Sequence, residues 1–564
     1  MLPKEVVCSC TSLFLLQKSV LSDKFHASLA TYGGKYMLQI KNLNITHLKD
    51  NRVLLQDLSF TLNQGDKAAI IGEEGNGKST LLKLIYDETL VEDYVEYTGE
   101  IIKNQARIGY LPQELSQEEK VFTAYEFMCE NNFDSLFLEA DVAELSQISR
   151  QLKLPLEMFY SEQLVGQMSG GEKIKLQFAR ILVNKPDILL LDEPSNDLDM
   201  DTVYWLEDFI KETSLPVLYI SHDEVLLEHT ANKIIHLEQI KRKTESRSTV
   251  IKSNYKDYVN RRNSSLLHQE QVARKERSEY QKQQEKFRQI QQKVEHQQNV
   301  ISRQDPHGGA LLKKTMHRVK AYEARFEKQY ENMTEIPETE DAIFIKFGES
   351  SAIPAGKMVL DYYLPELRIE SKEIILDEIH SINKADYCLA RNIHLFIRGA
   401  EHICIIGKNG CGKTTLLRKI AEELLARTDI KASYMPQNYE ELLDMAQTPV
   451  EFLCETGDKE EMSKIRTYLG SMKYTADEMS HSIGDLSGGQ KAKILLLKMS
   501  VAGSNVLILD EPTRNFSPLS NPVIRQMLKR FKGTIISVSH DRKYIEEVAD
   551  KVYELTAEGL IKKE

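Results

Sequence analysis

Two glycine-rich stretches decide the fold of this chain: Gly72-Glu-Glu-Gly-Asn-Gly77-Lys78-Ser79 in its first half and Gly407-Lys-Asn-Gly-Cys-Gly412-Lys413-Thr414 in its second. Each follows a short apolar run, at residues 68–71 and 403–406. Glycines in this pattern let backbone N–H groups close around phosphate oxygens, while the lysine reaches the phosphates and the hydroxyl can hold Mg2+. The pattern therefore predicts two phosphate-binding loops, each placed between a strand and a helix.

Further motifs recur in the same order in both halves. The first half has Ser169-Gly-Gly-Glu172, then Leu189-Leu-Leu-Asp192-Glu193, then Ser221-His222-Asp223; the second has Leu486-Ser487-Gly-Gly-Gln490, Leu507-Ile-Leu-Asp510-Glu511 and Ser539-His540-Asp541. From the serine to the glutamate the interval is 24 residues in both halves, and from the glutamate to the histidine it is 29. This equal spacing indicates an internal duplication.

Together these motifs resemble the nucleotide-binding domains of ATP-binding-cassette (ABC) proteins. Each half carries a P-loop, a Q-loop (Gln113 in Tyr-Leu-Pro-Gln, Gln437 in Tyr-Met-Pro-Gln), a signature, a Walker B strand, a D-loop and an H-loop. The resemblance implies an α/β fold of two P-loop ABC-type domains, each with a small antiparallel β region and a helical subdomain that carries the signature. Apolar strands alternating with helical stretches indicate the same class.

The resemblance implies ATP and Mg2+ as cofactors and hydrolysis of ATP to ADP and phosphate at two sites. In phosphoryl transfer to water, cations neutralise the phosphates and a carboxylate orients or deprotonates the water. The predicted catalytic residues are Glu193, Glu511, His222, His540, Gln113 and Gln437. Mg2+ is assigned to Ser79, Asp192 and Gln113 in one half and to Thr414, Asp510 and Gln437 in the other.

The nucleotide contacts are predicted from the loops and from the signatures. They are Gly72, Gly75, Gly77, Lys78, Ser79 and Thr80; Gly407, Gly410, Gly412, Lys413, Thr414 and Thr415; Ser169, Gly170 and Gly171; and Ser487, Gly488 and Gly489. In the family, the signature of one half caps the nucleotide on the other. Lys78 is thus expected to work with Ser487, and Lys413 with Ser169, within a monomer whose two halves close on each other.

The halves differ after the Walker B glutamate. The first D-loop reads Ser195-Asn-Asp-Leu-Asp199, close to the family pattern, whereas the second reads Thr513-Arg-Asn-Phe-Ser-Pro518 and lacks those aspartates. We therefore expect the two sites to hydrolyse ATP at unequal rates.

Composition limits the class of protein. A chain of 564 residues with 41% hydrophobic and 28% charged residues is globular and too long for one core. It contains no run of about 18 apolar residues, so no membrane domain is predicted. Seven cysteines are scattered without a disulfide or zinc framework, which indicates a reducing cytoplasm. Residues 1–36 precede the first fold-like pattern and are predicted to be a disordered extension, with a regulatory role left open.

Residues 241–335 form a basic segment between the two halves. The segment holds 22 Lys and Arg against 12 Asp and Glu, a balance of +10 in a chain whose total is −12, so the rest carries −22. A positive segment on an acidic body favours a polyanionic partner. Arg303, Lys313, Lys314, Arg318 and Lys320 gather around Gly308-Gly309 and are the candidate RNA-binding residues.

An apolar residue recurs at every seventh position of this segment, from Val259 to Ile301 and again from Leu312 to Met333. A break at residues 305–309 separates the two series. Heptads on both sides of a glycine turn predict a two-helix antiparallel coiled coil. The predicted domains are therefore the extension (1–36), a first ABC ATPase (37–240), the basic hairpin linker (241–340) and a second ABC ATPase (341–564).

Two cassette halves joined by a charged hairpin, without a membrane domain, resemble the ABC-F family of translation factors. That family implies a linker that enters the E site of the 70S ribosome near P-site tRNA, rRNA and the peptidyl-transferase centre. Residues 302–314 and 511–520 look most like the antibiotic-resistance subgroup, which protects ribosomes from drugs. A housekeeping translation factor, the ATPase of a transporter and a nucleic-acid repair or structural adaptor stay as alternatives.

Overall fold

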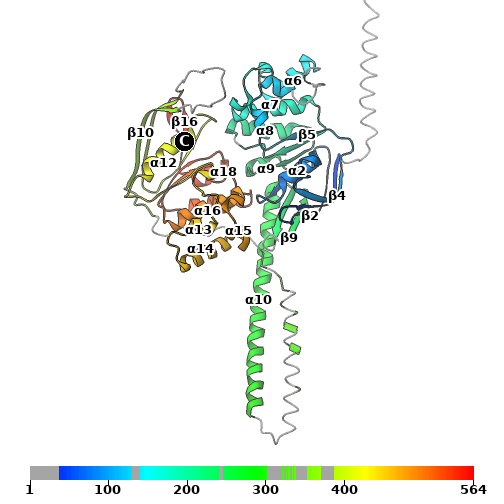
Figure 1. Cartoon of the computed structure of the whole chain (residues 1–564), viewed down its shortest axis with the longest axis vertical. Helices are drawn as coiled ribbons and strands as arrows, with labels where there is room; N and C mark the ends of the chain where they lie inside the picture. Colours follow the sequence, from blue (N-terminus) through cyan, green and yellow to red (C-terminus); the bar gives the residue numbers. More distant parts are fainter. Residues whose placement is uncertain are drawn as a thin grey trace, which may run out of the picture.

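The computed structural model describes residues 37–129, 137, 140–196, 198–240, 245–300, 352–369 and 387–563, and separate residues between 314 and 337. It consists of two α/β bodies side by side and one long helix, α10 (Tyr255–Val300), that extends away from them (Figure 1). The predicted extension, residues 1–36, lies outside the described residues.

The central sheets of the two bodies have the same strand order, which is the topological form of the duplication. In the first sheet the order is β5 (Ile108–Leu111), β6 (Ile188–Asp192), β7 (Val217–Ile220), β3 (Lys67–Gly72), β8 (Lys233–Ile240) and β9 (Glu245–Ile251). In the second it is β13 (Ala432–Met435), β14 (Val506–Asp510), β15 (Thr534–Val538), β12 (His402–Ile406), β16 (Lys551–Thr556) and β17 (Gly559–Lys563). Only the last strand of each of these sheets is antiparallel to its neighbour.

Alternation along the buried strands separates two cores in each body. Leu189 and Leu191 of β6 face one core, whereas Ile188 and Leu190 face the other. On the first side lie α4 (Ala124–Cys129), α6 (Val142–Leu152), α7 (Gly170–Val183), α8 (Met200–Glu212) and α9 (Glu224–Thr230). On the second side lie α2 (Lys78–Tyr86) and an antiparallel sheet of β2 (Arg52–Leu62), β1 (Leu38–His47) and β4 (Val95–Ile102).

The second body repeats this layering. Its antiparallel pair, β10 (Met358–Ile369) with β11 (Tyr387–Arg398), shares one core with α12 (Lys413–Leu425). The opposite core is covered by α13 (Pro449–Leu453), α14 (Lys459–Ser471), α15 (Ala476–Ser480), α16 (Gly488–Val501), α17 (Asn521–Lys529) and α18 (Arg542–Val548). The predicted α/β class is therefore confirmed in both halves.

The segment between the bodies starts later than the sequence suggested. Strand β9 pairs with β8, so the first sheet continues past residue 240 into residues that we assigned to the linker. Helix α10 then covers nearly all of the first predicted heptad series, which runs from Val259 to Ile301. Described residues of the returning segment contact it: the rings of Phe287 and Phe326 lie 5.3 Å apart, and Thr334 N donates to Glu276 Oε2 at 2.8 Å.

A cluster of buried charges joins the two bodies. The Arg525 guanidinium, on α17, donates to Glu224 Oε1 of α9 at 2.5 Å, and their side chains are only 2% and 6% exposed. Lys543 of α18 adds a second contact to Glu224 at 3.2 Å. Because a buried charge is costly unless it is paired, this cluster fixes the way in which the bodies face each other.

Within the described residues no helix is long and apolar enough to span a bilayer.

Arg525→Ala is expected to lower the free energy of unfolding by about 3 kcal/mol, because it leaves the Glu224 carboxylate buried without its main partner. Urea titration followed by circular dichroism measures the change. The control is Lys41→Ala, which removes an exposed pair with Glu100 whose side chains are 45% and 66% exposed. This control should cost less than about 1 kcal/mol. Equal losses in the two variants would contradict the structural role of the buried pair.

Candidate active site

Both glycine-rich loops lie where the sequence predicted, between β3 and α2 and between β12 and α12. The Lys78 ammonium, at the start of α2, turns back into its loop and donates to the carbonyls of Gly72 at 2.9 Å and Glu73 at 3.0 Å. Lys413 donates in the same way to the carbonyl of Gly407 at 2.9 Å. Burial lowers the pKa of Lys78, and the surrounding carboxylates oppose this change. Each loop thus presents one buried ammonium at the base of its glycine cradle.

The residues assigned to Mg2+ include hydroxyl and carboxylate oxygens that lie close together. Ser79 Oγ donates to Asp192 Oδ1 at 2.9 Å, which joins the loop to the end of β6. Asp192 Oδ2 and both carboxylate oxygens of Asp510 are buried and form no well-oriented hydrogen bond in the described part of the chain, although Thr414 lies close enough to Asp510 to act on its pKa. Burial raises the pKa of Asp192 to about 6. Buried, unpartnered carboxylate oxygens beside a hydroxyl suit a hard cation such as Mg2+.

Glu193 follows β6 directly and has a backbone φ of 49°, a region that residues with side chains rarely adopt. Its carboxylate lies 3.1 Å from His222 Nε2 and accepts a hydrogen bond from Asn196 Nδ2 at 2.6 Å. Burial alone would raise the pKa of Glu193, but the charges of His222 and Lys78 and the hydrogen bonds outweigh it and lower the pKa to about 2. Glu193 is therefore an ionised carboxylate held in one position.

Glu511 occupies the same place after β14 and has a φ of 51°, but its environment differs. Burial, together with the charge of Asp510, raises its pKa to about 8. The His540 ring stands farther away, with Nε2 at 3.8 Å, and burial lowers the pKa of His540 to about 4. At neutral pH both groups are mostly uncharged, so this contact is not an ion pair. The two glutamate–histidine pairs thus differ in charge although their motifs match.

His222 connects its own site to the other half. Its Nδ1 lies 2.6 Å from the carbonyl oxygen of Phe516, in the D-loop of the second half. A carbonyl can only accept, so Nδ1 carries the proton in this contact. The second D-loop lacks the family's aspartates, yet its backbone still reaches His222 of the first half, which the sequence predicted to be catalytic.

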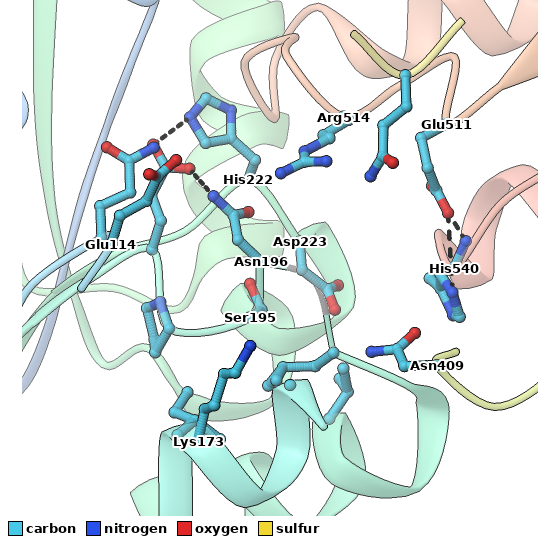
Figure 2. A pocket seen from close by; sticks show the side chains of 18 of the residues that line it. Glu114, Lys173, Ser195, Asn196, His222, Asp223, Asn409, Glu511, Arg514 and His540 are labelled. Carbon is cyan, nitrogen blue, oxygen red and sulfur yellow. Dashed lines mark hydrogen bonds and ion pairs between the residues drawn. The ribbon is translucent and has the colours of Figure 1, made fainter. Parts of the chain in front are cut away.

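A cavity of about 730 Å³ opens between the halves and contains most of the predicted residues of the second site. The second half lines it with Gly410, Gly412, Lys413, Thr414, Thr415, Gln437, Asp510, Glu511 and His540. The first half contributes Gln113, Gly170, Glu193 and His222. Figure 2 shows His222 on one side of this space and Glu511 with His540 on the other. Glu193 lies beside His222, at 3.1 Å from its Nε2. The pairing of Lys413 with the first signature loop is thus present, through Gly170 beside Ser169.

The first P-loop meets the second signature across a much smaller space. A gap of about 30 Å³ is lined by Glu73 and Glu74 from the P-loop and by Ser487, Gly489 and Gln490 from the signature. Ser169 is the N-cap of α7 and Ser487 is the N-cap of α16. In each case the serine side chain accepts a hydrogen bond from the backbone N–H three residues further on, and the side chain of that residue, Glu172 or Gln490, accepts one from the backbone N–H of the serine. These reciprocal caps explain why the Ser-Gly-Gly-Glu and Ser-Gly-Gly-Gln patterns begin helices.

Sequence reasoning missed several residues at the sites. Lys173 and Arg514 line the large cavity, Asn196 holds Glu193, and Glu74 lies between the first P-loop and the second signature. Glu74 carried a signal, because an acidic residue inside a phosphate-binding loop is unexpected and the second loop has Asn409 there.

The predicted RNA-binding residues are mostly not described. Arg303, Lys313, Arg318 and Lys320 lie outside the described residues, whereas Lys314 is helical and exposed.

Comparison with known proteins agrees with the ABC-type motifs and fold described above. The family profile "ABC transporter" matches residues 55–196 and 390–514. The chain is 28% identical to "ABC transporter F family member 2" of Arabidopsis thaliana, over 92% of this chain and 76% of that protein. It is also 28% identical to "Ribosome protection protein VmlR" of Bacillus subtilis, over 92% and 87%. In fold it resembles the archaeal ribosome recycling factor solved with a ribosomal stalk protein, with a TM-score of 0.54, 16% identity, and 92% and 90% of the chains covered.

At pH 7 and saturating ATP, Glu193→Gln is expected to reduce ATP turnover more than Glu511→Gln. The pKa of about 2 keeps Glu193 ionised, whereas the pKa of about 8 leaves only about a tenth of Glu511 ionised. Phosphate release by the two purified variants measures the difference. Equal losses would argue against unequal sites.

The pH dependence should separate the sites further. In Glu193→Gln, where Glu511 is the remaining base, turnover should rise about tenfold per pH unit below 8 and level off above it, because only the ionised carboxylate accepts a proton. In Glu511→Gln, the remaining Glu193 is ionised throughout, so turnover should be nearly flat from about pH 6 to 9. Parallel profiles would be inconsistent with the two environments described above.

Proposed function

The chain is an ATP-hydrolysing member of the ABC-F family of ABC proteins, and from this premise we propose that it is a ribosome-binding factor. In this proposal it works in the cytoplasm, where its linker enters the 70S ribosome near P-site tRNA and the peptidyl-transferase centre and displaces antibiotics bound there. Similarity over most of the chain to a protein named for ribosome protection supports the proposal.

The shape of the linker supports an extended polyanionic partner. Helix α10 runs for 46 residues away from the two bodies (Figure 1), and its outer part is largely exposed. The aromatic contacts of Tyr280 and Phe287 with Phe326 hold the returning segment against it. A long, positively charged helix that extends beyond the two bodies can enter a groove walled by RNA, which a compact domain cannot.

The observation that carries the proposal is a contact between the linker and the ATPase machinery. At the base of α10, the buried Tyr255 hydroxyl donates to the carbonyl of Pro518 at 3.0 Å. Pro518 ends the second D-loop, and Phe516 of the same loop contacts the catalytic His222 at 2.6 Å. Movement of residues 513–518 during ATP binding or hydrolysis would therefore displace the base of α10. Over the length of this helix, a small rotation at the base becomes a large displacement at the far end.

The residues divide the work as follows. Lys78 and Lys413 neutralise phosphate charge, and Glu193 and Glu511 orient the attacking water and accept its proton. Mg2+, when bound by Ser79 with Asp192 or by Thr414 with Asp510, supplies further positive charge for the phosphates. Binding of ATP across both interfaces draws the halves together in the shape that binds the ribosome. Hydrolysis separates the halves and releases the factor.

The double variant Glu193→Gln, Glu511→Gln tests the proposal, because it should bind ATP without hydrolysing it. We expect it to sediment with 70S ribosomes through a sucrose cushion when ATP is present and to remain in the supernatant with ADP. No sedimentation with ribosomes would refute ribosome binding, and sedimentation that does not depend on the nucleotide would refute its control by ATP.

Charge reversal at the tip tests the protection step separately. Changing Arg303, Lys313 and Lys314 to Glu should abolish resistance in a susceptible host over a panel of drugs that act at the peptidyl-transferase centre, with ATP turnover retained. The matched control reverses three exposed lysines of the ATPase bodies, Lys49, Lys529 and Lys562, and should preserve resistance. Ribosome binding without resistance to any drug would favour the housekeeping role.

A further inference from the structure

A carboxylate of the first P-loop occupies the start of the signature helix of the opposite half. Glu74 Oε2 accepts a hydrogen bond from Gly489 N at 2.5 Å, although the two residues are 415 positions apart in the chain. Gly489 lies in the first turn of α16, a helix of 14 residues. The unpaired N–H groups and the dipole of a helix N-terminus favour an anion at this place. Here the protein supplies the anion itself.

The surroundings of this carboxylate are closely fitted. A Cβ atom on Gly488 would lie 3.2 Å from Glu74 Oε1, and one on Gly489 would lie 2.6 Å from the carbonyl oxygen of Asn515. The backbone of α16 therefore approaches Glu74 and the second D-loop more closely than a side chain would permit. The remaining space between the first P-loop and the second signature is the gap of about 30 Å³, whereas the cavity of about 730 Å³ opens beside the second P-loop and also reaches Glu193 and His222.

Two departures from the repeated pattern meet at this point. The first P-loop has Glu74 where the second has Asn409. The second D-loop has Asn515 at the position where the first has Asp197, four residues after the glutamate in each half. The Asn515 side chain lies beside the glutamate, since Glu74 Oε1 and Asn515 Cγ are the atoms that approach a Cβ on Gly488 most closely. An aspartate at residue 515 would place a second carboxylate next to Glu74, and like charges at this distance repel. The missing aspartate and the added glutamate thus match each other.

We propose that Glu74 is a built-in latch of the first site: its carboxylate binds the signature helix in place of a nucleotide phosphate and must leave before ATP can bridge the two halves there. The proposal rests on ATP binding and not on the ribosome, so it can fail or hold independently of the proposed function. The same amide of Gly489 cannot serve both anions, and a phosphate held by the glycine cradle would lie next to a carboxylate of like charge.

The latch makes the two sites act in order. The second loop has the neutral Asn409, and its site is an open cavity, so ATP can enter there without displacing a protein group. In the first site, Glu74 occupies the contact between the P-loop and the opposite signature, and ATP binding exchanges this carboxylate for a phosphate. Glu74 is thus a positioning residue that sets the ATP concentration at which both sites become occupied.

The first measurement is hydrogen exchange of the amides at residues 487–490 in the full chain without nucleotide. Glu74→Asn installs the residue of the second loop and should raise exchange at these amides at least tenfold. Asn515→Asp should do the same by repelling the carboxylate. Glu73→Gln removes one negative charge from the same loop without touching Gly489 and should leave exchange unchanged.

The second measurement is the affinity of the first site for a non-hydrolysable ATP analogue with Mg2+, by calorimetry in a Lys413→Ala background that removes binding at the second site. If Glu74 occupies the signature helix about nine-tenths of the time, only about a tenth of the protein can bind the nucleotide at the first site. Removing this competitor should therefore raise the apparent affinity about tenfold, which is the result expected for Glu74→Asn. Glu74→Gln, which keeps the shape and removes the charge, should give an intermediate gain and serves if the asparagine variant does not fold. Unchanged exchange at residues 487–490, together with affinity within twofold of the parent, would overturn the latch.

Discussion

The buried pairing of Arg525 with Glu224 is the interaction on which the rest of the structure depends. Neither charge could stay inside the protein alone, so the helix α17 of one body and the helix α9 of the other must remain in register. This register brings the D-loop of the second half to His222 of the first and the signature of each half toward the P-loop of the other. The contacts that cross between the halves at the two sites follow from that face-to-face arrangement.

Because the two halves share one architecture, differences between their ATP sites can be traced to a few side chains. The central sheets have the same strand order, the glutamates have the same unusual backbone conformation, and the signature helices have the same caps. Against this common frame, only the immediate surroundings differ. Glu193 is ionised beside His222, whereas Glu511 is buried and largely protonated. The two glutamates therefore differ in ionisation although their motifs are the same, because the ionisation of a carboxylate depends on the charges and the solvent around it.

The second D-loop connects the ATP sites to the linker. Its backbone contacts His222 on one side and the buried Tyr255 on the other, so the catalytic centre and the base of α10 share one short segment. The loss of the family's aspartates from this segment does not sever the connection, since both contacts use carbonyl oxygens.

The sequence by itself determined the fold class, the duplicated order of motifs and the location of α10, because glycine loops, buried strands and helix caps are local patterns that do not need distant partners. It placed the linker boundary too early, since β9 is recognisable only by its pairing with β8. It also could not reveal that Glu74 binds Gly489, that Phe516 binds His222, or that the pKa values of Glu193 and Glu511 diverge. Those features arise between residues hundreds of positions apart, and only the tertiary structure brings such residues together and removes water from between them.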